Sequence, residues 1–393
     1  MRVAVVAPTE IPSRRANSIQ VMKMAQALVK LGFTVRLTAP RPSPPGAAGV
    51  SPPTWEYLQQ HYGLQCSFAI EWLSAKPALR RYDYGWQAVR WARSWQADVL
   101  YTRLPQAAAL ASQSGLPTIF EVHDMPQGFW GPHLFRWFLR GKGARRLVVI
   151  TSALAQDLER FFGVAVQPPF TMIASDGVDL ERYANLPDPV EARKQLLQTA
   201  NGITEAMLPP ERFTAGYTGH LYAGRGVELL LELARRLPEI TFLLVGGEPQ
   251  EVARLRSQTL AERLNNIILT GFIPNEKLPV YQAACEVLLM PYQRRVTASS
   301  GGDIARYLSP MKVFEYLACG RAILSSDLPV LQEALNSENA VLLPSQDVDA
   351  WMLALQRLRD LPDERLRLAR RARQDAAQYT WEARAARIFD LQI

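Results

Sequence analysis

The sequence has few cysteines, few histidines and no long apolar run. Its three cysteines lie far apart without a CxxC pair, so we expect neither a disulfide framework nor a cysteine-rich zinc site, and a reducing cytoplasm is the natural compartment. None of the four histidines stands at metal-ligand spacing from another, and we expect no metal. No apolar run approaches the roughly 20 residues that span a bilayer. No secretory signal pattern opens the chain, so neither an integral membrane protein nor a secreted one is expected.

The chain is long for one core and its charge is uneven. Its 393 residues, 48% of them hydrophobic, predict two globular domains. Residues 1–190 hold 20 basic and 13 acidic residues, whereas residues 191–393 hold 24 of each, so the whole net charge of +7 lies in the first half. A basic half favours an anionic partner such as a phosphate or acidic lipid. Because no nucleic-acid-binding module is recognisable, we do not expect nucleic acid.

Short apolar runs alternate with helical patterns along both halves. Such alternation predicts parallel strands covered by helices on both faces, and hence an α/β protein of two tandem Rossmann-like, doubly wound domains. The strands expected in the first half are 3–7, 33–37, 98–101, 118–122 and 147–150. Those expected in the second half are 213–217, 241–245, 266–270, 287–290, 322–325 and 340–343.

Proline placement sets the domain boundaries. Four prolines surround a polar helical stretch at 184–211. We therefore expect an N-terminal domain over 1–185, a linker over 186–211 and a C-terminal domain over 212–376. Ligands of doubly wound sheets bind at the carboxyl ends of the strands, so a ligand is expected in a cleft where the two sheets meet.

The strongest local signal is the helix start Ser309-Pro310-Met311-Lys312. Ser309 suits the N-cap, Pro310 suits the first helical position, and Gly320 ends the helix. Free N–H groups and the positive dipole end favour a phosphate there. The loop at 299–302 just before it, Ser-Ser-Gly-Gly, has a backbone that could approach a ligand. A well-capped amphipathic helix explains the same residues equally well.

Two weaker signals follow other strands. The glycine-rich turn from Gly219 to Gly226 could cradle a diphosphate, with Arg225 as a charged fork. His123 ends the strand at 118–122 and could donate a hydrogen bond or carry a proton. A tight turn with a solvated arginine, and a satisfied structural histidine, are the plainer interpretations and are favoured for each signal in isolation.

In combination and in this order, the signals resemble the family 4 retaining nucleotide-sugar glycosyltransferases of the two-domain GT-B fold, in a divergent branch. That family has a Gly-Arg-Leu-x3-Lys-Gly turn, similar to Gly219-His220-Leu221 and Arg225-Gly226. Its Gly-Phe-Val segment resembles Gly271-Phe272-Ile273, and its Glu-Ala-Met-Ala-x-Gly helix resembles the residues from Glu315 to Gly320. The family's Pro-Asn-Gly-Val-Asp segment resembles Ser175-Asp176-Gly177-Val178-Asp179, and its Tyr-Ser-Trp segment resembles Tyr379-Thr380-Trp381. The last helix of that fold returns to the first domain, so residues 377–393 are expected to pack there.

The resemblance implies roles for particular residues. It implies transfer of a sugar from a nucleoside-diphosphate sugar to an acceptor hydroxyl, with no cofactor and no required metal. Residues implied to hold the diphosphate are Gly219, His220, Arg225, Ser309, Pro310, Met311 and Lys312. Residues implied at the nucleoside are Gly271, Phe272, Ile273 and Glu315, and those at the donor sugar are Asp303, Tyr307 and His123. The residues of direct catalytic importance are His123, Arg225 and Glu315.

Departures from the family pattern leave other functions open. The family has a glutamate eight positions before Glu315, where this chain has Tyr307, and Asp303 is the nearest acid. His220 and Arg225 replace the family's arginine and lysine. We interpret these changes as subfamily variation. The alternatives are a nucleotide-sugar epimerase on the same fold and a non-catalytic nucleotide-sugar-binding relative.

Two basic segments in the first half could meet other partners. The loop containing Ser13, Arg14, Arg15, Asn17 and Ser18 replaces the family's Gly-Gly and could bind a phosphate on the otherwise unknown acceptor, although a solvated basic loop explains these residues equally well. From residue 129 to 146, aromatic residues alternate with basic ones, and residues 125–156 contain no acid. A second tryptophan-rich stretch covers residues 80–95. Such segments suit peripheral attachment to an anionic membrane at the cytoplasmic face, although the aromatics could equally fill the core.

Overall fold

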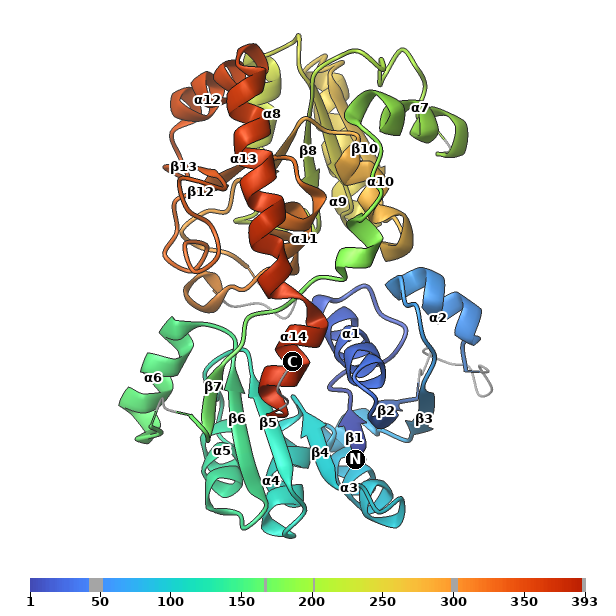
Figure 1. Ribbon diagram of the computed structural model, residues 1–393, viewed down its shortest axis with the longest axis vertical. Helices are drawn as coiled ribbons and strands as arrows, with labels where there is room; N and C mark the ends of the chain where they lie inside the picture. The colour runs from blue at the N-terminus through green and yellow to red at the C-terminus, as the bar shows by residue number, and fades with distance from the viewer. Residues whose placement is uncertain (42–51, 166–167, 201, 298–302, 391–393) are drawn as a thin grey trace. The chain divides into compact units, whose positions relative to one another are not determined.

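The computed structural model describes residues 1–41, 52–165, 168–200, 202–297 and 303–390 (Figure 1). The chain folds as two units, one made of Met1–Asp176 with Trp381–Ile393 and the other of Gly177–Thr380. Each unit is a parallel sheet with helices, as the alternating pattern predicted. The fold class expected from the sequence is therefore confirmed.

The first unit has a seven-stranded sheet in the order β3-β2-β1-β4-β5-β6-β7. The strands are β1 (Arg2–Val6), β2 (Thr34–Pro40), β3 (Ala69–Leu73), β4 (Val99–Thr102), β5 (Thr118–Val122), β6 (Ala144–Val149) and β7 (Thr171–Ile173). The helices are α1 (Ala16–Lys30), α2 (Trp55–Tyr62), α3 (Tyr82–Ser94), α4 (Pro105–Gln113), α5 (Gly131–Arg140), α6 (Ser152–Phe162) and α14 (Trp381–Ile388). The sequence patterns predicted five of these strands and missed the two edge strands, β3 and β7.

The second unit has a six-stranded sheet in the order β10-β9-β8-β11-β12-β13. The strands are β8 (Thr214–Thr218), β9 (Thr241–Val245), β10 (Ile267–Gly271), β11 (Val287–Met290), β12 (Ala322–Ser326) and β13 (Val341–Leu343). The helices are α7 (Pro189–Thr199), α8 (Val227–Arg236), α9 (Pro249–Ala261), α10 (Leu278–Ala283), α11 (Met311–Cys319), α12 (Val348–Asp360) and α13 (Pro362–Asp375). All six strands lie where the apolar runs placed them, within one or two residues.

Both faces of the second sheet are buried. On β9, Phe242 and Leu244 belong to one apolar cluster, while Leu243 and Val245 belong to another. Successive side chains of a strand point to opposite faces, so helices cover the sheet on both sides. The carboxyl ends of its strands, and the loops that follow them, are then the natural place for a ligand.

The stretch 186–211, expected as a linker, lies inside the second unit instead. Its helix α7 buries Arg193, whose guanidinium forms an ion pair of 2.9 Å with Glu286 and donates to the carbonyl oxygen of Ala284. This anchoring explains why a proline-flanked polar stretch is structured. The unit boundaries fall at Asp176/Gly177 and at Thr380/Trp381.

The last described helix, α14, is part of the first unit and packs on α1 (Figure 1). The Lys30 amino group on α1 lies 3.1 Å from a Glu382 carboxylate oxygen on α14. Within the described ranges, no helix has both the length and the apolar character needed to cross a membrane.

Candidate functional site

The loop after β8 is shaped by glycines that the backbone requires. Gly224 and Gly226 have φ values of +83° and +80°. A Cβ atom on either would lie 2.0 Å from a backbone oxygen, that of Arg295 or that of Pro291. These two glycines therefore let the loop pack against the segment after β11, and this packing positions Arg225 between them.

Arg225 is held over an aromatic ring. Its Nη1 donates a hydrogen bond of 2.7 Å to the Tyr292 hydroxyl, and its guanidinium carbon lies 5.0 Å from the centroid of the same ring. Its buried Nε has no hydrogen-bond partner among the described residues. The guanidinium is thus held in position while its Nε–H group remains available to donate to an anion.

Lys312, in the first turn of α11, is buried without a polar partner. Its Nζ lies 3.8 Å from the centroid of the Tyr217 ring and 5.3 Å from that of Tyr292. In the part of the chain that the structure describes, no atom accepts a hydrogen bond from it. Burial, with a further contribution from the nearby positive charge of Arg225, lowers the pKa of the amino group well below its ordinary value. An anion that reached this amino group would supply the missing partner.

Glu315 lies one turn further along α11 and is half-buried. Its Oε2 accepts a hydrogen bond of 3.3 Å from Nε2 of Gln282, which also donates to the Thr218 hydroxyl at the end of β8. The Tyr316 hydroxyl accepts a bond of 2.8 Å from the Thr218 N–H. This network ties α11 to the end of β8, so Glu315 and Lys312 lie at the carboxyl end of the sheet.

The start of α11 differs by one residue from the prediction. Pro310 occupies the N-cap position with an extended backbone, and the helix begins at Met311, so Ser309 is not the N-cap. The reason is that the Pro310 carbonyl oxygen accepts from the Val313 N–H, a bond that makes Pro310 the flanking residue. Gly320 ends the helix in a left-handed conformation as predicted.

Two of the residues expected around the donor sugar, Asp303 and Tyr307, lie in the segment just before α11. Asp303 is exposed, and its Oδ1 accepts the backbone N–H groups of Val296 and Ala305. These two hydrogen bonds stabilise the turn, and they also lower the pKa of the carboxyl group. Tyr307 closes a short 3-10 helix, Ala305–Tyr307. The loop at 299–302 lies outside the described residues.

The other expected residues lie at the ends of β8 and β10. Gly219 has a φ of +131° and donates its N–H to the carbonyl oxygen of Val245. The His220 ring stacks on Tyr222 with 4.7 Å between centroids. Gly271 ends β10, Phe272 is exposed and Ile273 packs partly buried against the core.

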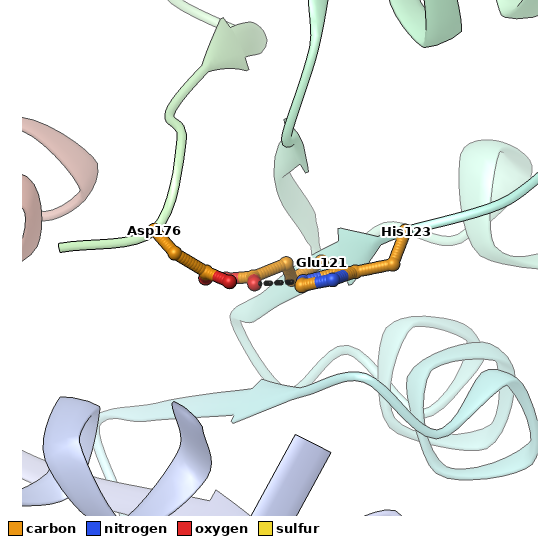
Figure 2. A group of neighbouring side chains, drawn as sticks. All are labelled: Glu121, His123 and Asp176. Carbon is orange, nitrogen blue, oxygen red and sulfur yellow. Dashed lines mark hydrogen bonds and ion pairs between the residues drawn. The ribbon is translucent and has the colours of Figure 1, made fainter. Parts of the chain in front are cut away.

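In the first unit, His123 belongs to a buried polar cluster. Figure 2 shows Glu121 between His123 and Asp176. Nε2 of His123 lies 2.5 Å from Oε1 of Glu121. Burial, reinforced by the positive charge of Arg103, lowers the pKa of His123 to about 4, so the imidazole is neutral near pH 7. Because the ionised Glu121 carboxylate only accepts, Nε2 carries the proton of the neutral ring, and Nδ1 is left as a hydrogen-bond acceptor.

Glu121 is the centre of that cluster. Nη2 of Arg384, on α14, lies 2.9 Å from its Oε2, and both side chains are fully buried. Gln20 and Tyr101 also donate to the carboxylate. Although burial alone would raise the pKa of Glu121, the Arg384 guanidinium holds it well below the ordinary range. No local pattern predicts this pair, because its members lie in distant segments of the chain.

Asp176 completes a set that could ligate a metal. Ligand atoms of Glu121, His123 and Asp176 lie within 4.8 Å of one another. The two Glu121 oxygens are already engaged by several donors, including Arg384, so a cation would have to displace them. Oδ1 of Asp176 is buried and has no hydrogen-bond partner in the described ranges. Its burial raises the pKa of the carboxyl group to about 6.

The loop expected at residues 13–18 ends at Arg15, because α1 begins at Ala16, and hydrogen bonds of Ser13 and Ser18 hold it in place. The Ser13 N–H donates to the Tyr62 hydroxyl, and the Ser18 hydroxyl donates to the carbonyl oxygen of Ser13. Arg14 and Arg15 are exposed, and Arg15 takes the N-cap position of α1. Asn17 has a buried Oδ1 without a partner within the described part of the chain.

Solved structures with the same two-domain α/β fold match nearly the whole chain. A sucrose-phosphate synthase from Thermosynechococcus elongatus has a TM-score of 0.71 and 18% identity, with 99% of this chain and 97% of that one covered. Anabaena Alr3699/HepE in complex with UDP-glucose has a TM-score of 0.71 and 17% identity, with 99% and 98% covered.

Family models match both halves. "Glycosyltransferase Family 4" matches residues 18–182 and "Glycosyl transferases group 1" matches residues 212–360. A D-inositol 3-phosphate glycosyltransferase from Corynebacterium urealyticum is 26% identical over 258 residues, which cover 62% of this chain and 55% of that protein. The chain thus spans about half the length of the curated relatives it matches. The chain belongs to the family 4 glycosyltransferases.

Proposed function

We propose that the protein transfers a sugar, with retention of configuration, from a nucleoside-diphosphate sugar to an acceptor hydroxyl. The observation that carries this proposal is the buried Lys312 amino group, which faces the Tyr217 ring and lacks a polar partner among the described residues. A buried cation without a counter-ion is costly. A diphosphate bound beside Lys312 would remove that cost, and the free N–H groups at the start of α11 would add to its binding.

The reaction forms a bond from the acceptor oxygen to the anomeric carbon and breaks the bond from that carbon to the diphosphate oxygen. The acceptor proton passes to a departing phosphate oxygen, so no separate base is required. Negative charge grows on the diphosphate as it leaves. Lys312 and Arg225 stabilise that charge most in the transition state, which is how they accelerate transfer.

Other residues are proposed to hold the rest of the donor. Glu315 accepts hydrogen bonds from the ribose hydroxyls, and the base lies near Gly271–Ile273. Asp303 and Tyr307 contact the donor sugar. One related solved structure holds UDP-glucose, which supports a nucleoside-diphosphate sugar as the donor class.

Arg14 and Arg15 are proposed to contact an anionic group on the acceptor. Both side chains are exposed at the start of α1, and a helix start with two guanidinium groups favours phosphate. A relative is named for D-inositol 3-phosphate, which supports an acceptor of that chemistry. We place the protein in the cytoplasm, where its three cysteines, all free in the structure, would remain reduced.

The two cations also make a metal unnecessary in this proposal, because they neutralise the leaving diphosphate themselves. Transfer in the presence of EDTA at the wild-type rate is expected. Loss of transfer in EDTA, restored by a divalent cation, would contradict this part of the proposal.

The test is a transfer assay with a panel of uridine, guanosine and adenosine diphosphate sugars. Arg225→Ala and Glu315→Ala are expected to reduce transfer strongly, whereas Arg254→Ala, which removes an exposed arginine of α9, leaves it unchanged. Wild-type rates in both site variants would show that these roles are wrong.

Tyr307, in place of a family carboxylate, favours one alternative, a relative that binds nucleotide sugar without turnover. Binding of a donor with no transfer to any acceptor would support that alternative. Isomerisation of the donor without acceptor would instead indicate an epimerase.

A further inference from the structure

Helix α5 has two faces of different character. Leu134, Phe135 and Phe138 are buried. The outer face presents His133, Arg136, Trp137 and Arg140, all exposed, at the i, i+3, i+4, i+7 spacing of one helix face. The aromatic residues of 129–146 therefore fill the core only in part, because the stripe through Trp137 points away from it.

The exposed side of α5 carries an unusual amount of aromatic surface. Phe129, Trp130 and Trp137 are 77%, 57% and 55% exposed. The rings of Phe129 and Trp130 meet edge to face with 5.1 Å between centroids. Phe161, at the end of α6, is 60% exposed, and its neighbour Phe162 lies under the Arg136 guanidinium. Large aromatic side chains gain most from leaving water, so this surface favours an apolar partner.

Positive charge surrounds these rings. Arg136 and Arg140 lie on the same face as Trp137, and Arg160 lies over the Phe161 ring at 5.6 Å from its centroid. Residues 125–156 contain no acid, and Glu159 is the exposed acid of α6. Aromatic rings bordered by guanidinium groups match the apolar boundary and phosphate groups of an acidic lipid surface.

We infer that Phe129, Trp130 and Trp137, with Arg136 and Arg140, form a docking surface for an anionic membrane. We call these five residues the α5 surface. Helix α5 has ten residues, too few to span a bilayer, so it lies along the interface with its rings among the headgroups. This surface is independent of the nucleotide site and does not rest on the proposed transfer reaction.

The second tryptophan-rich stretch differs from the α5 surface. On α3, Trp91 is buried, and its Nε1 donates to a Glu71 carboxylate oxygen. Trp86 is 52% exposed, with the Arg90 guanidinium 4.6 Å from its ring centroid. An acid, Asp83, lies in the first turn of this helix. Trp86 therefore offers a matched control, an exposed tryptophan beside an arginine on a helix that carries an acid in its first turn.

The experiment is flotation of the full chain with vesicles of phosphatidylcholine alone or with about one third phosphatidylglycerol. Binding is expected to the acidic vesicles and to be lost at high salt. Phe129→Ser with Trp137→Ser is expected to abolish it. Arg136→Ala with Arg140→Ala is expected to weaken it roughly 25-fold, since each basic residue near an acidic surface contributes about five-fold. Trp86→Ser should bind as wild type does.

Three results would overturn the inference. One is the absence of binding to acidic vesicles, and another is equal binding by the Phe129/Trp137 variant. The third is a concentration-dependent dimer in lipid-free solution that the same variant abolishes, which would assign the α5 surface to a second copy of the chain. Unchanged thermal unfolding of the variants controls for folding, since all the substituted side chains are exposed.

Discussion

A Cβ atom placed on Gly219 would lie 2.8 Å from the amino nitrogen of Lys312. The glycine at the end of β8 therefore makes room for the buried cation of α11. Gly219, in the turn that resembles the family's, thus contributes to the site because it has no side chain that would displace Lys312.

Gly219→Ala is expected to displace Lys312 and weaken nucleotide binding roughly ten-fold, measured by calorimetric titration. Gly32→Ala is the control, since Gly32 also has a positive φ, of +83°, but has no atom within 4 Å of its Cβ position. Both variants should lose some stability from backbone strain. An equal loss of affinity in both would show that strain, and not contact with Lys312, is responsible.

Binding of a nucleoside diphosphate is expected to take up a proton through Lys312. The pKa of its amino group is well below the ordinary value in the free protein because the group is buried. A bound diphosphate favours the charged form and raises that pKa. Calorimetry at pH 9 in buffers of different ionisation enthalpy should show this uptake.

Lys312→Met should remove the proton uptake. If the variant takes up as many protons as the wild type, another group titrates on binding and Lys312 is not the residue that meets the diphosphate.

Asp176→Asn is expected to stabilise the protein at pH 8 but not at pH 4. Burial raises the pKa of Asp176 from 3.8 to about 6, so the folded state binds this proton more tightly. The protonated carboxyl group therefore contributes to the stability of the folded state below pH 4. This contribution, roughly 3 kcal/mol for a pKa shift of this size, is lost as the pH rises through 6. Melting temperatures at the two pH values measure the effect.

The exposed Asp363 is the matched control, and Asp363→Asn should leave both melting temperatures unchanged. A gain for Asp176→Asn that is equal at pH 4 and pH 8 would contradict the explanation, because a protonated carboxyl group carries no charge to relieve.

Arg384→Met is expected to destabilise the first unit by about 3–5 kcal/mol, the usual cost of leaving one member of a buried ion pair alone. Arg384 and Glu121 are fully buried and 2.9 Å apart. Denaturant unfolding measures the loss. The exposed pair Arg236–Asp349 provides the comparison, and Arg236→Ala should unfold at the wild-type midpoint. A wild-type midpoint for Arg384→Met would mean that α14 does not hold the unit together.

Much of the fold could be predicted because buried parallel strands are continuous apolar runs. Strands such as Thr241–Val245 and Val287–Met290 lie where those runs are. The edge strand Ala69–Leu73 was missed because it has an acid at its centre and is half-buried. Edge strands are covered on fewer sides, so their sequences carry a weaker apolar signal.

The candidate site could be predicted in its residue types but not in its environment. The helix start at Lys312 and the turn at Arg225 were visible as motifs. The rings of Tyr217 and Tyr292, which remove Lys312 from water, come from β8 and from the segment after β11. No local pattern links them, because the sheet topology alone brings those segments together. Arg384 and Glu121 are likewise distant in the sequence, and only the fold brings them together in the interior.

The central claim is that Lys312 binds the diphosphate of a nucleotide sugar. The most direct measurement is a calorimetric titration with uridine, guanosine and adenosine diphosphates of the wild type, of Lys312→Met and of Lys277→Met, which removes an exposed lysine. The account predicts that at least one nucleotide binds the wild type and the Lys277 variant equally, and binds Lys312→Met roughly 10- to 100-fold more weakly. Equal affinity for Lys312→Met, or no binding of any of the three to the wild type, would contradict it.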